Sequence, residues 1–181
     1  MEALMRFGSL LPRHAKLVAG PVTALALAAC VGGAVQETTP IQVDQGRAAA
    51  MVSEFRAANG LGPVGVDSRL SQAAGTQAVA MGRRDTLSHR VGGSLARRVS
   101  AVGYDWGATA ENIGAGYSSL DDVMAGWRAS AGHRKNLLNP NVTEIGIAAV
   151  ATPPGAAKRS YWALVLAGPR PETAGAATFP F

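Results

Sequence analysis

The chain has 181 residues, of which 48% are hydrophobic and 16% are charged, and its formal net charge is +5. This length fits one domain with short appendages, and the composition excludes an intrinsically disordered chain. Part of the positive charge lies in residues 1–29, so the remainder carries only +3. A charge this small does not indicate a nucleic-acid-binding protein, and we expect no nucleic-acid partner.

Residues 1–29 have the composition of an export signal. A basic start is followed by an apolar run of 13 residues, Leu17 to Ala29. This run is shorter than the roughly 20 residues that a membrane-spanning helix needs, which favours a cleaved signal peptide. The following residue is Cys30, and Leu27-Ala28-Ala29-Cys30 resembles the lipobox of bacterial lipoproteins. That resemblance implies cleavage before Cys30, acylation of its side chain, and a membrane partner through the lipid anchor.

Cys30 is the single cysteine, so a disulfide framework and a cysteine-ligated metal site are both excluded. Val31 stands where an aspartate would indicate retention in the inner membrane, so we expect the outer membrane in a cell with two membranes. The alternative is an ordinary signal peptide cleaved near Gly33-Ala34. In both cases the protein is exported and its domain faces the periplasm or the exterior.

After the leader, residues 30–44 are small and polar and predict a tether. Apolar residues then recur at helical spacing from about residue 45 to Gly60. A second helix is predicted from an N-cap at Asp67 to Gly82, and a short third helix from an N-cap at Ser94.

Strand-like residues begin at Ala110–Tyr117, and Ser118 with Asp121 resembles a capping box that opens another helix. Residues 143–150 and 160–167 are apolar, of strand length, and joined by a Pro- and Gly-rich turn, which predicts an antiparallel pair. The chain is therefore α+β, with a domain at residues 45–170 and a flexible tail at residues 171–181.

Five arginines lie between residues 83 and 98, at positions 83, 84, 90, 97 and 98. Two interpretations are open. A solvated rim is the commoner explanation of such a run, and a patch that binds phosphate or lipid headgroups is the other.

Seven short motifs follow one another in the order seen in bacterial CAP (SCP-like) domain proteins, the superfamily of cysteine-rich secretory proteins, wasp-venom allergens and plant pathogenesis-related proteins. They are Arg56–Leu61, Ser88-His89, Ala110–Ile113, Gly126-Trp127 with Gly132–Arg134, Asn139-Pro140, Glu144–Ile147 and Tyr161-Trp162. The resemblance covers roughly residues 45–168, and the chain is identified as a member of this family.

The resemblance implies a three-layer α-β-α sandwich in an exported protein, with a small, mainly antiparallel sheet between helices. It also implies a shallow cleft where two histidines and an acid can hold zinc or another divalent metal. The matching residues are His89 and His133, as metal ligands, with Glu111 beside them. Many eukaryotic members have a second glutamate after the helix tryptophan, where this chain has Arg128.

Imidazole and carboxylate are good zinc ligands, but His89, Glu111 and His133 are each 22 residues apart and no local His-Glu-x-x-His motif holds them. The alternative is structural, with Glu111 accepting backbone amides and each histidine satisfying a buried carbonyl. Ser88 and Ser130 lie near the histidines, but no Gly-x-Ser-x-Gly elbow supports serine hydrolysis.

Three functions follow from these features, and the catalytic residues, if any, are unassigned. The first is an anchored binding module whose cleft engages a lipid, a sterol-like molecule, a glycan or a protein. The second is a metal-dependent hydrolase, a peptidase or esterase, that uses His89, His133 and Glu111. The third is a purely structural envelope protein. We rank binding first, structure second and catalysis third.

Overall fold

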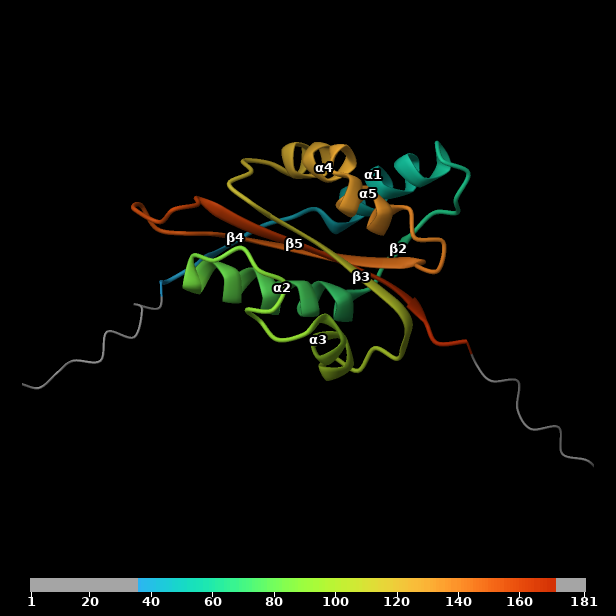
Figure 1. Ribbon diagram of the computed structural model, residues 1–181, viewed down its shortest axis with the longest axis horizontal. Helices are drawn as coiled ribbons and strands as arrows, with labels where there is room; N and C mark the ends of the chain where they lie inside the picture. Colours follow the sequence, from blue (N-terminus) through green and yellow to red (C-terminus); the bar gives the residue numbers. More distant parts are fainter. Residues whose placement is uncertain (1–35, 172–181) are drawn as a thin grey trace, which may run out of the picture. The chain divides into compact units, whose positions relative to one another are not determined.

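The computed structural model describes residues 36–171, which form five helices and five strands (Figure 1). The predicted leader, Cys30 and the tail at residues 172–181 lie outside the described residues. The helices are α1 (Gln45–Ala57), α2 (Ser68–Arg84), α3 (Leu95–Ala101), α4 (Leu120–Ala129) and α5 (Ala131–Leu137). The strands are β1 (Thr39–Ile41), β2 (Gly65–Val66), β3 (Trp106–Ala115), β4 (Glu144–Ala151) and β5 (Ser160–Pro169).

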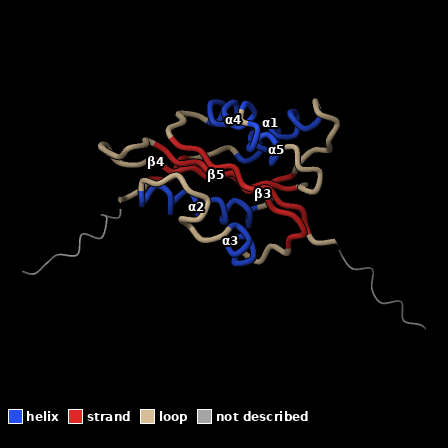
Figure 2. The backbone as a smooth tube through the Cα atoms, in the orientation of Figure 1, coloured by secondary structure: helices blue, strands red, loops and turns tan. Residues whose placement is uncertain are grey.

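One sheet runs in the order β1-β4-β5-β3, with every neighbouring pair antiparallel, and β2 adds a short parallel pairing with β4 (Figure 2). The predicted antiparallel pair of late strands is therefore confirmed as β4 and β5. Helices α1, α4 and α5 cover one face of the sheet, and α2 and α3 cover the other (Figure 1). The three-layer α-β-α sandwich of the CAP type is also confirmed.

Each face of the sheet has its own hydrophobic core. Trp127, Met124 and Trp162 lie in the core under α1, α4 and α5, and Leu70, Met81 and Tyr161 lie in the core under α2. The central strand β5 contributes to both cores and is buried from Ser160 to Gly168. Because both faces of this strand are covered, its sequence is a continuous apolar run instead of an alternating one. The assignment of Trp127 as a core residue is confirmed, since it is 1% exposed.

The helix starts follow from local capping. The carboxylate of Asp67 accepts from the backbone N–H of Arg69 at 2.7 Å, and the hydroxyl of Ser94 accepts from that of Arg97 at 3.3 Å, as predicted. The predicted capping residue of α4 is wrong by one position. Ser119, not Ser118, caps this helix, and its hydroxyl accepts from the backbone N–H of Asp122 at 3.1 Å.

Helix α2 continues past Gly82, where the sequence predicts its end. A Cβ at Gly82 would lie 2.8 Å from a methyl group of Val150, so this glycine lets the helix approach β4 closely. The helix ends instead at Arg84, and the C-cap residue that follows, Asp85, adopts the left-handed conformation with φ 46°. Closer to its start, α2 crosses Gly146 of β4, where a Cβ would be 2.0 Å from the backbone nitrogen of Ser71.

The predicted tether of residues 30–44 is wrong at its C-terminal end. Thr39–Ile41 form β1 and pair with Ala149–Ala151 of β4, so the folded domain begins before residue 45. The backbone N–H of Gln36 also donates to the carbonyl of Arg83 at 2.9 Å. All five strands and both cores therefore lie between residues 39 and 169. Within residues 36–171, no helix has the length and apolar character needed to cross a bilayer.

Candidate functional site

Glu111 occupies the middle of β3, an outer strand of the sheet, and its side chain faces the layer of α2 and α3. Successive side chains of a strand point to opposite faces, so the next residue, Asn112, faces the layer of α5. Two neighbouring residues of one strand thus reach both helical layers. This alternation places Glu111 near the loop that carries His89, and Asn112 near the helix that carries His133.

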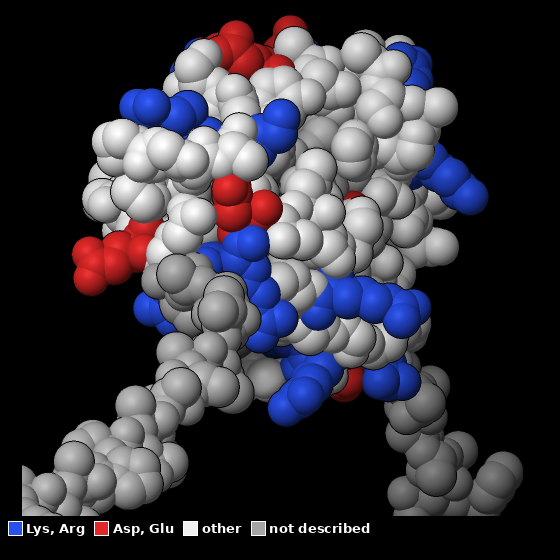
Figure 3. All heavy atoms as spheres, turned by 60° about the vertical axis from the view of Figure 1, so that its left-hand side comes forward, with Lys and Arg blue, Asp and Glu red and all other residues white. Residues whose placement is uncertain are grey.

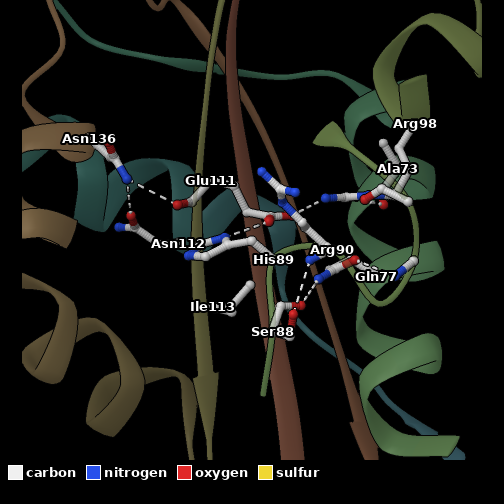
Figure 4. A network of polar contacts seen from close by, with 12 residues as sticks. Ala73, Gln77, Ser88, His89, Arg90, Arg98, Glu111, Asn112, Ile113 and Asn136 are labelled. Carbon is white, nitrogen blue, oxygen red and sulfur yellow. Dashed lines mark hydrogen bonds and ion pairs between the residues drawn. The ribbon is translucent and has the colours of Figure 1, made fainter. Parts of the chain in front are cut away.

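The Glu111 carboxylate is buried, with its side chain 3% exposed, and both of its oxygens are occupied (Figure 4). Oε1 accepts from Arg98 Nη2 at 2.7 Å, and Oε2 lies 2.8 Å from His89 Nδ1. Arg98 is equally buried and also donates to the carbonyl of Ala73 at 3.3 Å. The arginine thereby compensates a carboxylate that would be costly to bury alone.

His89 lies at the outer end of this chain of contacts, and its side chain is 57% exposed. The ion-paired carboxylate can only accept, so Nδ1 of His89 is the donor of the bond to Glu111. The lone pair of the neutral ring is then on Nε2, away from Glu111. A carboxylate that orients a histidine in this way is a common partner of metal-binding imidazoles, because it fixes the ring and raises its basicity.

Gln77, a buried residue of α2, holds the loop that presents His89. Its Nε2 donates to the carbonyl of Ser88 at 2.6 Å, and its Oε1 accepts from the backbone N–H of Gly92 at 3.1 Å. The residue is 0% exposed, so both bonds form away from water. A loop fixed on both sides of His89 keeps the imidazole at the surface in one orientation (Figure 4).

His133 comes from the opposite layer, on α5. Its backbone carbonyl accepts from Asn112 Nδ2 at 3.1 Å, and its ring meets the ring of Trp127 edge-on at a centroid distance of 6.4 Å. Asn136, one turn further along α5, donates to the carbonyl of Glu111 at 3.0 Å and to Asn112 Oδ1 at 2.9 Å. Burial lowers the pKa of His133 below 6.5, and repulsion from the nearby His89, when that ring is protonated, lowers it further.

The sequence-predicted residues thus take different roles. His89 and Glu111 are in direct contact, and His133 is close enough to His89 for their charges to interact. Glu111 lies behind His89 and is not itself exposed to a ligand. The hydroxyl of the nearby Ser88 accepts from the backbone N–H of Arg90 at 3.2 Å. Ser130 occupies the N-cap position of α5, but its hydroxyl forms no capping hydrogen bond.

Residues 49–166 match the family model described as the cysteine-rich secretory protein family, CAP. The chain belongs to the CAP family. Protein YkwD of Bacillus subtilis (strain 168) is 34% identical over 94 residues, which are 51% of this chain and 37% of YkwD. The chain therefore spans well under half of the length of this relative.

Solved structures show the same fold. An outer surface protein of Borrelia burgdorferi superposes with a TM-score of 0.60 at 20% identity, over 73% of this chain and all of that one. An extracellular protein containing an SCP domain from Bacillus anthracis str. Ames gives a TM-score of 0.59 at 23% identity, over 68% of this chain and 40% of that one. At these identities the similarity concerns the CAP fold alone.

Two residues of the site were missed in the sequence. Gln77 lies inside the second predicted helix without a role of its own, and Arg98 belongs to the run of five arginines. A signal was present in both cases, because a polar side chain within a buried helical face needs a polar partner. Gln77 interrupts an otherwise alanine-rich face, and Arg98 is followed by the buried Val99.

Arg128 stands where many eukaryotic CAP proteins have a second glutamate, and here it has a structural role. Its Nη2 donates to the carbonyl of Met51 at 2.6 Å, and its guanidinium lies 5.4 Å from the centre of the Phe55 ring. These contacts join α4 to α1 in the helical layer that also contains α5. Within residues 36–171, no group of three or more His, Cys, Asp or Glu side chains is arranged to hold a metal ion.

Only two side chains of the predicted site, both histidines, are available as ligands for a divalent metal. The imidazoles of His89 and His133 have the right chemistry, whereas both oxygens of Glu111 are committed to Arg98 and His89. Catalytic zinc sites usually have three protein ligands. Water or a bound ligand would have to supply the remaining positions, so we expect weak metal binding.

Proposed function

We propose that this protein is an exported, lipid-anchored CAP-domain protein of the cell envelope, and that His89 and His133 form its ligand-binding site. Two observations support export: the leader with its lipobox-like sequence, and structural relatives that are described as outer-surface and extracellular proteins. The site binds a divalent metal, zinc among others, or a polar group of a lipid, glycan or protein ligand.

One observation carries the assignment of the site. An imidazole with 57% of its side chain exposed is held by a carboxylate that is itself buried against an arginine. Burying two opposite charges to hold a surface residue is costly, since desolvation opposes their attraction. A solvated histidine without a function needs no such support. The arrangement favours a role for the exposed Nε2 of His89 in binding.

The same geometry favours binding over hydrolysis. A metal bound by the two imidazoles would supply Lewis acidity, but a hydrolase also needs a group that takes a proton from the attacking water. Glu111 is the acid that contacts His89, and both of its oxygens already accept hydrogen bonds inside the protein. His89 and His133 would hold the metal and orient the ligand.

Calorimetric titration of a fragment of residues 31–181 with zinc tests the site. We expect one zinc per protein, and a loss of affinity of at least about tenfold for His89→Ala and for His133→Ala. Ser88→Ala and Ser130→Ala are the neighbouring controls and should bind as the parent does. Equal zinc binding by the parent and by the double histidine variant would show that the pair is not a metal site.

Three further measurements separate the parts of the proposal. The mass of the intact protein extracted from membranes tests acylation of Cys30. An ester or peptide hydrolysis rate that depends on zinc and on both histidines would replace the binding assignment with the hydrolase. An unchanged phenotype after replacement of both histidines, with the fold intact, would favour a structural envelope protein.

A further inference from the structure

Four basic residues from two distant segments meet at the C-terminal end of α2. Arg83 and Arg84 form the last turn of the helix, and Lys158 and Arg159 immediately precede β5. Asp85 connects the two segments, because its carboxylate accepts from the backbone N–H of Ala157 at 2.6 Å and from that of Lys158 at 3.3 Å. We call Arg83, Arg84, Lys158 and Arg159 the basic surface.

All four side chains of the basic surface are exposed, and none forms an ion pair or a hydrogen bond with another residue in the range 36–171. Two acids lie close by. Asp85 is engaged by backbone N–H groups and by the hydroxyl of Tyr161, and these bonds lower its pKa. Glu37 lines a small hollow together with Arg83. The four cations therefore outnumber the acids, and Figure 3 shows basic side chains gathered over the lower, α2-side part of this face.

An exposed aliphatic residue and an open hollow adjoin the basic surface. Leu87 lies three positions after the last residue of α2 and is 51% exposed, which is unusual for a large hydrophobic residue in this domain. The hollow, of about 640 Å³, lies along α2 between Arg83, Arg84 and the apolar side chains of Val79 and Val91. Basic residues around exposed apolar ones are the composition of surfaces that rest on a membrane interface.

The N-terminal edge of the domain, at Gln36, also lies beside the C-terminal end of α2. The N–H of Gln36 bonds to the carbonyl of Arg83, and Gln36 stands six positions after Cys30. Six residues of fully extended chain span about 20 Å at most. An acyl group on Cys30 would therefore keep the basic surface no more than about 20 Å from the bilayer, so the surface can approach the headgroups to within one Debye length, about 8 Å at physiological salt.

We infer that the basic surface docks the domain onto anionic lipid headgroups of the membrane that holds its anchor. This inference rests on the proposed acylation of Cys30, which puts the membrane within reach. Favourable interaction with the α2 dipole explains Arg83 and Arg84 in part, but Lys158 and Arg159 are not on a helix. Each basic residue near an anionic leaflet increases partitioning about fivefold, which corresponds to about 1 kcal/mol.

Sedimentation with lipid vesicles tests the docking in the fragment of residues 31–181, which contains the whole described fold and lacks Cys30. Vesicles of phosphatidylcholine alone are compared with vesicles that also contain phosphatidylglycerol. We expect binding only to the anionic vesicles, and a loss of at least about tenfold in partitioning for the variant Arg83→Gln/Arg84→Gln. Raising the salt to about 1 M shortens the Debye length to about 3 Å and should abolish binding by the parent.

Arg134→Gln/Lys135→Gln is the control for loss of charge alone, because it removes two basic side chains from the last turn of α5, on the opposite side of the sheet (Figure 1). It should bind anionic vesicles as the parent does. Equal losses for the two double variants, or equal binding to both kinds of vesicle, would overturn the proposal. So would binding to soluble polyphosphate, but not to vesicles, through the same arginines. Because the fragment lacks Cys30, these results are independent of acylation, which the mass of the intact protein tests separately.

Discussion

The ion pair between Arg98 and Glu111 makes a quantitative prediction about stability. Both side chains are 3% exposed, and their atoms Nη2 and Oε1 are 2.7 Å apart. Removing one charge from such a pair leaves the other buried without compensation, which costs about 3–5 kcal/mol. We expect this loss in the free energy of unfolding for Glu111→Gln and for Arg98→Met. In a chain of this size the midpoint of thermal unfolding would fall by about 6–20 °C.

Urea unfolding, followed by the fluorescence of the buried Trp127 and Trp162, measures these free energies. The double variant Arg98→Met/Glu111→Gln buries neither charge, so it should recover much of the loss and be more stable than the sum of the single effects predicts. Arg47 and Asp121 are the control pair, since they are also 2.7 Å apart but 53% and 55% exposed. Replacing either of them should cost about 0–1 kcal/mol.

Two results would refute this reasoning. The first is that single variants at Arg98 and Glu111 lower the free energy of unfolding no more than those at Arg47 and Asp121. Burial would then not increase the loss of stability. Strictly additive effects of Arg98→Met and Glu111→Gln would show that the two charges do not compensate each other.

Three further predictions concern the loop, the histidine and the packing. Gln77→Ala should cost about 1–3 kcal/mol and weaken zinc binding by freeing the His89 loop, which calorimetry detects. The folded-state pKa of His133 lies below 6.5, so the unfolded chain binds more protons and the free energy of unfolding falls as the pH drops through 6.5. His133→Asn should weaken this pH dependence, which urea titrations at several pH values measure. An unchanged dependence of the free energy of unfolding on pH would contradict the prediction. Gly146→Ala forces a methyl group into the backbone of α2 and should cost about 3 kcal/mol or more in the same assay, whereas Gly132→Ala, where nothing lies within 4 Å, should cost nothing.

Much of the fold could be predicted because its causes are local. The caps at Asp67 and Ser94 depend on residues two or three positions away, and the apolar runs of β4 and β5 are long enough to identify as strands. Gly82 was misassigned as a helix end because its reason is tertiary. It lies against Val150, which is 68 positions away in sequence.

The site was predictable only in its outline. Motif order identified His89, Glu111 and His133, but spacing could not show that Glu111 is buried behind His89. That arrangement depends on Arg98, whose side chain reaches from α3 to Glu111 on β3. The basic surface was equally hidden, because the run of arginines in the sequence splits in the fold. Arg98 enters the core, whereas Arg83 and Arg84 join Lys158 and Arg159 at the surface.

The central claim is that one ligand engages both imidazoles, with Nε2 of His89 free to bind. Nitrogen-resolved NMR of the two histidine rings in the fragment of residues 31–181, recorded during a zinc titration, tests it most directly. We predict that His89 carries its proton on Nδ1 before zinc is added, and that both rings shift together as one equivalent binds. A proton on Nε2 of His89, or rings that respond to zinc at different stoichiometries, would contradict the account.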